Sequence, residues 1–314
     1  MSITLEKLIA QDTFPKNFTW HYWQSDAWKT AKEDNGCKAF WVTVKDAKVL
    51  VIERKAHFLK FWVKPLWELP RGPIGNPEHF VELFEKIFAQ AREKDNNVGI
   101  VRVYAPFGTE SFWSNENFTE FLESNVHKKA PEIFPTNTLM IDLESEEDEI
   151  LAQMKQKGRY NIKLARKKGV VIEEEKNVEN FWNLMVETSK RDGFRSNKKH
   201  VYSDLLKSFG DDAVLYTAKD ETGDVLASAI FTMANGMAIY NYGASTSRKR
   251  GLMAPYLLQW TGMQWAKKKG AKVYDFLGIS PENSPNHSLN GVASFKLKFG
   301  GTRVICDYGL DFTL

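Results

Sequence analysis

Cysteine is scarce in this chain of 314 residues, which contains only Cys37 and Cys306. The two cysteines are far apart, and neither belongs to a group of residues with metal-ligand spacing. These observations argue against a disulfide scaffold and against a zinc site, so no metal is expected. A reduced cytoplasmic compartment fits this cysteine content best.

The chain also lacks a long apolar run. Its most apolar window, Val225 to Tyr240, is interrupted by Ser228, Thr232 and Asn235-Gly236, whereas a membrane span needs about 20 apolar residues. Residues 1–7 lack the apolar core and the small-residue cleavage site of a secretory signal. Both observations favour a soluble protein.

A strong excess of either charge is missing as well. The 43 Lys and Arg residues nearly balance the 40 Asp and Glu residues, so the net charge is +3. Because so small a net charge does not predict nucleic-acid binding, any case for it must rest on local clustering. The length exceeds what one hydrophobic core usually supports, so two domains are expected.

Positive charge is concentrated after an acidic run at residues 144–149. Ser145 and Asp148 have the spacing of a capping box, so we predict a helix that opens there and ends at Gly169. One face of this helix is apolar, and the others carry cations with no acidic residue among them: Lys155, Lys157, Arg159, Lys163, Arg166, Lys167 and Lys168. Such a row suits nucleic-acid phosphates; the alternative is a solvated face balanced by the acidic run.

The two halves of the chain show the same order of predicted elements, in which antiparallel strands precede a helix and a further strand. In the first half we predict strands at 39–44, 49–54 and 66–69, a helix from Asn76-Pro77 to about residue 94, and a strand at 98–103. In the second half, hairpin signals join strands at 214–218, 225–233 and 237–242, before a helix at 255–269 and a strand at 272–277. The shared order predicts two copies of one α+β unit, with a binding cleft between them.

The segment after the last of these strands begins with an irregular loop that contains Pro281 and Pro285. Apolar residues then recur at helical spacing up to Gly300, so we favour a short helix with Lys296 and Lys298 in its last turn. The alternative is a strand that points both lysines outward. In either case Lys296 emerges beside large apolar residues, next to a loop well placed for a functional site.

The strand meander, the loop from Arg248 to Met253 and the helix after it resemble the acyl-CoA N-acetyltransferase fold. In that fold a loop of small residues at the helix N-terminus holds the pyrophosphate of CoA. Here Met253 occupies the position of the last small residue, where its side chain would obstruct a phosphate. The resemblance therefore implies the fold, whereas Met253 argues against CoA, and no cofactor is expected.

Six motifs, in order, resemble those of the FemABX aminoacyltransferases and together span nearly the whole chain. They are Arg71-Gly72-Pro73, Arg159-Tyr160-Asn161-Ile162-Lys163, Arg191-Asp192-x-Phe194, Tyr242-Gly243-Ala244-Ser245, Tyr274-Asp275-Phe276-x-Gly278-Ile279 and Phe295-Lys296-x-x-Phe299-Gly300. Members of that family have two acetyltransferase-like domains and transfer an amino acid from aminoacyl-tRNA to the side-chain amine of the peptidoglycan stem peptide. The chain resembles the compact form, because it lacks the sustained heptads of the coiled-coil arm that some members carry.

The resemblance implies a fold class and a domain plan. The fold would be α+β, with two tandem acyl-CoA N-acetyltransferase-like domains built on mixed sheets flanked by helices. Residues 1–143 with 308–314 would bind the precursor, and residues 144–307 would form the catalytic domain on the tRNA side. The expected partners are aminoacyl-tRNA and a UDP-linked or lipid-linked muramyl peptide precursor. We expect a monomer in the cytoplasm, with a peripheral place at the inner face of the plasma membrane as an alternative.

The resemblance also implies roles for individual residues. Lys296 would stabilise the charge that develops on the carbonyl oxygen during acyl transfer. Asp275 would help to remove the amine proton, although an Asp at a strand end equally often caps the backbone. The cations from Lys155 to Lys167 would contact tRNA. Four cations would bind the phosphates of the precursor, with a role as plain surface charges as the alternative: Lys29, Arg71, Arg191 and Arg195. Tyr202 and Tyr242 would position the peptide stem, or would belong to the core.

Two other functions stay open at this point. One is an acyl-CoA-dependent N-acyltransferase that acts on another amine, and the other is a non-catalytic tRNA-binding protein. The second leaves the motifs at Arg71 and at Phe295 to Gly300 unexplained. The donor amino acid, whether glycine, alanine or serine, depends on the size of a pocket and is not predicted.

Overall fold

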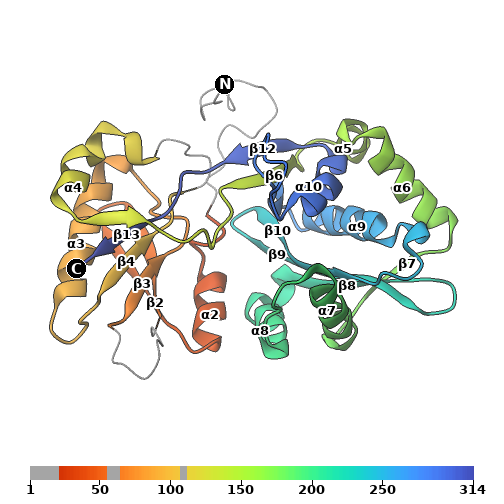
Figure 1. The fold of residues 1–314 in the computed structure, drawn as a ribbon, viewed down its shortest axis with the longest axis horizontal. Coiled ribbons are helices and arrows are strands. Elements are labelled where there is room, and N and C mark those ends of the chain that lie inside the picture. Colours follow the sequence, from red (N-terminus) through yellow and green to blue (C-terminus); the bar gives the residue numbers. More distant parts are fainter. Residues whose placement is uncertain (1–20, 55–63, 107–111) are drawn as a thin grey trace. The chain divides into compact units, whose positions relative to one another are not determined.

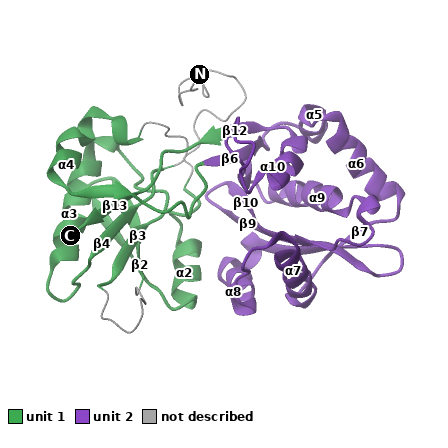
Figure 2. Ribbon diagram, viewed as in Figure 1, with its two compact units in different colours: residues 1–136, 304–314 green, residues 137–303 purple. Residues whose placement is uncertain are grey.

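A computed structural model describes residues 21–54, 64–106 and 112–314 of the chain. The chain divides into two compact units, residues 1–136 with 304–314 and residues 137–303 (Figure 2). Residues 1–7, interpreted above as lacking a secretory signal, lie outside the described residues. None of the helices in the described ranges combines a membrane-spanning length with sufficient hydrophobicity.

The first unit is built on a six-stranded mixed sheet with the order β1-β2-β3-β4-β13-β5. β3 and β4 are parallel, and the other neighbours in this sheet are antiparallel. The last strand of the chain, β13, lies between β4 and β5, so the C-terminal residues complete this sheet (Figure 1). The strands are β1 (Lys38–Val44), β2 (Ala47–Arg54), β3 (Leu66–Leu69), β4 (Ile100–Val103), β5 (His127–Lys129) and β13 (Leu310–Thr313).

Helices cover both faces of this first sheet. α3 and α4 pack on the face that carries Val101 and Phe312. On the opposite face Trp28 of α2 packs against Leu50 and Ile52. The helices are α2 (Asp26–Asp34), α3 (Phe80–Arg92) and α4 (Thr119–Ser124), with short 3-10 turns η1 (Pro77–His79), η2 (Phe112–Ser114) and η3 (Glu116–Phe118).

The second unit contains a seven-stranded mixed sheet with the order β12-β6-β11-β10-β9-β8-β7. β7 to β10 form an antiparallel meander, and β10 pairs with β11 in parallel. β6 then pairs with β11 in antiparallel fashion. The strands are β6 (Asn137–Asp142), β7 (Val171–Glu174), β8 (Ala213–Lys219), β9 (Val225–Ala234), β10 (Met237–Ser245), β11 (Val273–Gly278) and β12 (Thr302–Ile305).

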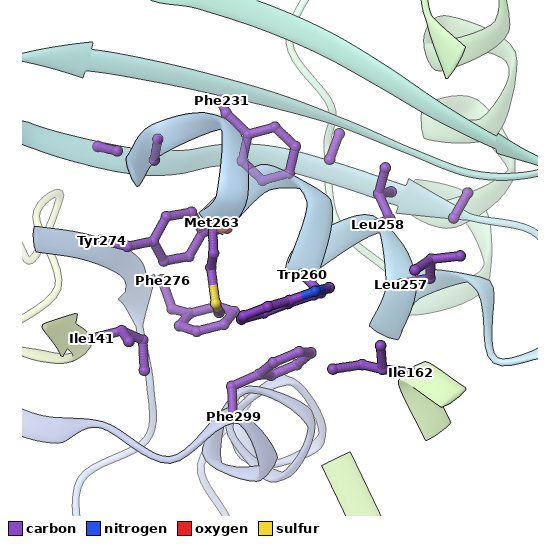
Figure 3. Packing of buried hydrophobic residues seen from close by; sticks show 14 of the residues in the cluster. Ile141, Ile162, Phe231, Leu257, Leu258, Trp260, Met263, Tyr274, Phe276 and Phe299 are labelled. Atoms are coloured by element: carbon purple, nitrogen blue, oxygen red, sulfur yellow. The ribbon is translucent and has the colours of Figure 1, made fainter. Parts of the chain in front are cut away.

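Helices flank this sheet too, with α7 and α8 on one face and α5, α6, α9 and α10 on the other (Figure 1). Trp260 of α9 lies at the centre of the core on the second face, among Ile162, Met263 and Phe299 (Figure 3). The helices are α5 (Glu147–Gln153), α6 (Gln156–Lys167), α7 (Glu179–Asp192), α8 (Lys199–Phe209), α9 (Ala254–Lys268) and α10 (Asn290–Lys296), with 3-10 turns η4 (Gly210–Asp212), η5 (Arg250–Leu252) and η6 (Leu297–Phe299).

The expected fold class is confirmed, because each unit is an α+β structure with a mixed sheet flanked by helices. The hairpin signals correctly predicted the antiparallel meander, and the helix and strand that follow it lie where the sequence placed them. The segment before Gly300 is helical in α10 and η6, so the strand alternative for Lys296 and Lys298 is wrong.

The predicted capping box is wrong by one residue. Glu146 is the N-cap of α5 and pairs with Glu149, in place of the predicted Ser145 and Asp148. The carbonyl of Ser145 accepts a hydrogen bond from the Lys267 Nζ atom (2.8 Å), which ties this residue to α9 before the helix begins. The acidic residues still lie in the first turn, where they favour the positive end of the helix dipole.

The single long helix predicted up to Gly169 is in fact two helices, α5 and α6. The chain is extended at Met154 and Lys155, and the Lys155 N–H donates to the carbonyl of Lys298 in η6 (3.1 Å). Gly158 lies against the same carbonyl, because a Cβ atom there would overlap it. A contact with a distant segment therefore interrupts a pattern that reads locally as one helix.

Because Gly158 makes this close approach possible, we expect Gly158→Ala to destabilise the second unit. An added methyl group in a packed contact typically costs ~1–3 kcal/mol, although alanine is the better helix former. Chemical denaturation measures the loss. Gly291→Ala in α10 is the matched control, since a Cβ atom there meets nothing within 4 Å and should leave stability unchanged or raise it by up to ~1 kcal/mol. Equal effects of the two substitutions would contradict this packing.

Candidate active site

The strands β10 and β11 part toward their C-terminal ends. Their parallel pairing ends at Ile239 and Asp275, although both strands run on. A register shift follows in each strand, between Tyr240 and Tyr242 in β10 and between Asp275 and Gly278 in β11. Diverging C-terminal ends of parallel strands are a common place for a ligand in α/β sheets.

The irregularity in β11 is supported by the side chain of Asp275. Leu277 has a left-handed backbone (φ 58°), which is uncommon for a residue of its size. Its N–H donates to Asp275 Oδ1 (2.7 Å), and the Thr138 hydroxyl from β6 donates to the same oxygen. Asp275 is fully buried, and these two hydrogen bonds replace some of those that its carboxylate would make with water.

Lys296 places its ammonium beside this irregular strand end. Its Nζ atom donates to the carbonyl oxygen of Gly278 (2.8 Å) and lies 3.4 Å from that of Leu277. The ring of Tyr240, on the neighbouring strand, is 5.9 Å away. Only 6% of Lys296 is exposed, because the turn from α10 into η6 buries Phe299 in the same core. The site therefore collects a buried cation, two carbonyl dipoles and an aromatic ring where β10 and β11 part.

Burial changes the acidity of this lysine. Loss of hydration lowers the pKa of Lys296 from 10.5 to about 8, while the negative charge of Asp275 acts in the opposite direction. The ammonium form therefore still dominates at neutral pH. In such a setting one positive charge interacts more strongly with a developing anion than it would in water.

Two of the predicted substrate-binding residues, Tyr202 and Tyr242, are brought together on the other face of the sheet. Their rings meet edge to face at 4.9 Å. The Asn197 N–H donates to the Tyr202 hydroxyl (3.1 Å), and the Asn197 side-chain amide donates to the Tyr242 hydroxyl (3.3 Å). Burial raises the pKa of Tyr242 to about 12, so its hydroxyl stays protonated. The pair fixes the segment between α7 and α8.

Arg191, in the last turn of α7, and Arg195, in the segment after it, are both exposed but differ in their partners. Arg191 donates to both carboxylate oxygens of Asp192 (2.8 and 2.9 Å) and to the carbonyl of Ser245 at the end of β10 (2.7 Å). Arg195 follows α7 and is exposed. A phosphate can therefore approach Arg195 directly, whereas at Arg191 it would compete with Asp192.

The predicted substrate-binding residues of the first unit have partners within that unit. Lys29 pairs with Glu33 one helical turn away (2.7 Å). Arg71 is 1% exposed, and its guanidinium donates to the carbonyls of Ala105 (3.2 Å) and Pro135 (2.6 Å). Arg71 thus joins loops of the first unit, and its contact with a precursor phosphate stays a prediction.

The predicted tRNA-binding residues lie on α6 and at its N-cap, Lys155. Arg159 donates to the carbonyls of Ala152 (3.1 Å) and Met154, so it closes the end of α5. The remaining five are exposed: Lys155, Lys157, Lys163, Arg166 and Lys167.

Sequence reasoning missed Tyr240, Thr138 and Asn197. Tyr240 and Tyr242 are two residues apart, a spacing that puts both on one face of a regular strand. The bulge between them reverses this: Tyr240 packs on the core beside Lys296, and Tyr242 packs on Tyr202 of α8. No local signal marks such a bulge.

Comparison with known proteins gives a consistent result. The model of the FemAB family matches residues 124–222 and 217–306. Lipid II:glycine glycyltransferase of Staphylococcus aureus is 23% identical over a match that covers 54% of this chain and 56% of that protein. The chain thus spans about half the length of the curated relatives it matches.

Solved structures show the same fold. The crystal structure of FemX matches with a TM-score of 0.80 at 19% sequence identity, covering 100% of this chain and 97% of that one. The structure of L-PGS from Bacillus licheniformis matches with a TM-score of 0.57 at 16% identity, covering 90% of this chain and 85% of that one. Because the family model matches more than half of its length, this chain belongs to the FemAB family.

Proposed function

We propose that this protein transfers an amino acid from aminoacyl-tRNA to the side-chain amine of the stem peptide of a peptidoglycan precursor. The observation that carries the proposal is the buried ammonium of Lys296 at the point where β10 and β11 part. The name of the S. aureus relative supports a lipid-linked acceptor, and a UDP-linked precursor is the alternative.

The proposed chemistry needs no enzyme nucleophile, because an aminoacyl ester is already activated. It needs a neutral amine, correct positioning and stabilisation of the oxyanion that forms as the amine attacks the carbonyl carbon. Lys296 supplies a positive charge in a site from which water is largely excluded. As the tetrahedral intermediate collapses, the ester C–O bond breaks, the amide bond remains, and the amine proton passes to the departing ester oxygen, so the tRNA leaves with a free ribose hydroxyl.

Asp275 acts in this proposal as a positioning residue. Its Oδ1 atom already accepts hydrogen bonds from Thr138 and Leu277, and it is fully buried. A carboxylate in this setting supports the strand bulge that aims two carbonyls at Lys296 and favours the charged form of that lysine. These two effects account for the residue without a role in removing a proton from the acceptor.

The loop before α9 argues against acyl-CoA as the donor. The N–H groups of Leu252, Met253 and Tyr256 each donate to a carbonyl three residues earlier (2.9, 3.1 and 3.0 Å), and Pro255 has no N–H. The Lys249 ammonium is held by two carboxylates of the β8–β9 turn (2.5 and 2.6 Å). Several of the groups that a pyrophosphate would need at this helix N-terminus are therefore already engaged.

The proposed donor and acceptor are assigned to different surfaces. The exposed cations of α6 suit tRNA phosphates, as the sequence pattern predicts. For the acceptor, the exposed Arg195 suits a precursor phosphate, and the pair Tyr202 and Tyr242 keeps its segment in place. A protein that only binds tRNA would have no use for a buried ammonium inside the second unit.

An assay of the complete reaction tests the proposal. The protein is supplied with tRNA charged with glycine, alanine or serine, and with either the lipid-linked or the UDP-linked precursor. We expect the mass of the lipid-linked precursor to increase by one amino-acid residue. Acylation from acyl-CoA alone, or no transfer from any charged tRNA, would contradict the proposal.

Replacing Lys296 should lower kcat with little change in KM, because the charge acts on the transition state. Lys296→Met keeps the length and apolar packing of the side chain and removes the charge. We expect kcat to fall ~10²–10³-fold, the usual loss for one oxyanion contact. Lys296→Arg should recover only part of the rate, since a planar guanidinium does not fit the place of an ammonium.

The matched control is Lys268→Met, at an exposed position in the last turn of α9, which should leave kcat unchanged. Thermal unfolding should show Lys296→Met to be as stable as the wild type or more stable, because a buried charge is lost. A folded Lys296→Met protein that retains more than about a tenth of the wild-type kcat would remove Lys296 from the mechanism.

A further inference from the structure

An exposed tyrosine lies in the middle of the basic face of α6. Tyr160 leaves 60% of its surface exposed. Lys157 and Lys163 stand three residues before and after it and Lys167 seven after it, so these side chains occupy neighbouring positions on the helix surface. The helix points Ile162 into the core instead (Figure 3). Within the described residues, no aromatic ring stacks on Tyr160.

The basic surface continues from α6 onto η6. The hydrogen bond from the Lys155 N–H to the Lys298 carbonyl (3.1 Å) holds the two segments together. The Lys298 Nζ atom donates to the carbonyl of Ser294 (2.6 Å). Burial, together with the positive charges of Lys157 and Lys155, lowers the pKa of Lys298. Lys155 and Lys157 therefore lie close to Lys298, although the two segments are far apart in the sequence. Lys298 is itself only two residues after Lys296.

The acidic run before α6 does not neutralise this surface. Glu144 pairs with Lys272 (3.5 Å), and Glu147 accepts a hydrogen bond from Gln264 of α9 (2.7 Å). In the part of the chain that the structure describes, no carboxylate forms an ion pair with Lys155, Lys298 or any cation of α6. Like charges gathered without a counterion raise the affinity of a surface for an anion supplied from outside.

We propose that this surface binds the single-stranded end of the donor RNA, with an unpaired base stacked on Tyr160 and the adjacent phosphates on lysines. It is called the stacking surface below and consists of Tyr160, Lys155, Lys157, Lys163, Lys167 and Lys298. The proposal deepens the proposed function and rests on it. An aromatic ring set among cations is the usual means of binding single strands, whereas a duplex keeps its base faces covered. Lys298 would bring the strand toward Lys296, where the ester must lie.

Binding of a short labelled RNA tests the proposal. The probes are a single-stranded oligonucleotide that ends in CCA and a blunt duplex of the same length. Their binding is measured by fluorescence anisotropy across a range of salt concentrations. Tyr160→Ala should weaken single-strand binding about 5- to 150-fold, the equivalent of ~1–3 kcal/mol for one stacked base. Tyr160→Phe keeps the ring and should bind as the wild type does. Tyr308→Ala is the control, since Tyr308 is an exposed tyrosine (41%) of the first unit.

The dependence on salt separates stacking from electrostatics. Tyr160→Ala removes no charge, so the slope of log K against log salt should stay the same. The triple variant Lys157→Ala, Lys163→Ala and Lys167→Ala should flatten that slope by up to about 2, since each single-strand phosphate contact contributes about 0.7. The stacking proposal would be overturned if duplex and single strand bind equally well and Tyr160→Ala changes neither affinity. If Tyr160→Ala weakens binding to anionic phospholipid vesicles more than binding to RNA, the stacking proposal is overturned in favour of a membrane-binding surface.

Amino-acid transfer measured in parallel separates this proposal from the proposed function. Tyr160→Ala should raise KM for charged tRNA and leave kcat nearly unchanged. If the wild type transfers an amino acid and Tyr160→Ala has the wild-type KM, the stacking proposal fails and the transferase stands. If the wild type transfers nothing but binds single-stranded RNA through Tyr160, the transferase proposal fails and the RNA-binding surface stands.

Discussion

The arrangement of the second unit depends on keeping the ammonium of Lys296 out of water. The decrease of its pKa from 10.5 to about 8 corresponds to a cost of about 3 kcal/mol for the charged form. The unfolded chain binds this proton more tightly than the folded chain. The charged form of Lys296 therefore destabilises the folded protein, and this destabilisation is progressively lost as pH rises from about 8 toward 10.5. A protein that keeps such a charge buried at neutral pH accepts a loss of stability at that position, which is typical of functional sites.

Two irregular strands make this charge tolerable. In β11 the bulge turns the carbonyls of Leu277 and Gly278 toward the Lys296 ammonium, and the Asp275 carboxylate satisfies the N–H that the bulge releases. In β10 the bulge turns Tyr240 to the same side. Regular pairing of β10 and β11 along their whole length would use the two carbonyls in hydrogen bonds between the strands. The irregular strand ends therefore supply the partners of the buried charge.

The same short segment connects the charge to the surface. η6 carries Lys298 and buries Phe299, and its backbone docks on α6 where Gly158 leaves room for the Lys298 carbonyl. The break between α5 and α6 results from this docking. Packing that positions the buried lysine thus also fixes the basic face on which Tyr160 is exposed. A disturbance at Gly158 would reach both.

Much of this structure could be predicted because it follows local rules. Hairpin signals and helical periodicity gave the meander, α9 and the helical form of α10, and motif resemblance led to the family. The rest depends on contacts between distant residues. The break at Lys155 requires Lys298, the opposite faces of Tyr240 and Tyr242 require a bulge, and the burial of Arg71 requires the carbonyls of Ala105 and Pro135. The sequence pattern alone contains none of these contacts.

The most direct test of this account is a titration of the Lys296 amine by NMR, with the lysine signal assigned by comparison with Lys296→Met. We predict a pKa near 8, because burial outweighs the favourable charge of Asp275. Asp275→Asn should lower the pKa of Lys296 further, since the variant loses a negative charge that stabilises the ammonium. A pKa close to 10.5 that Asp275→Asn leaves unchanged would contradict the buried charge on which the proposed mechanism depends.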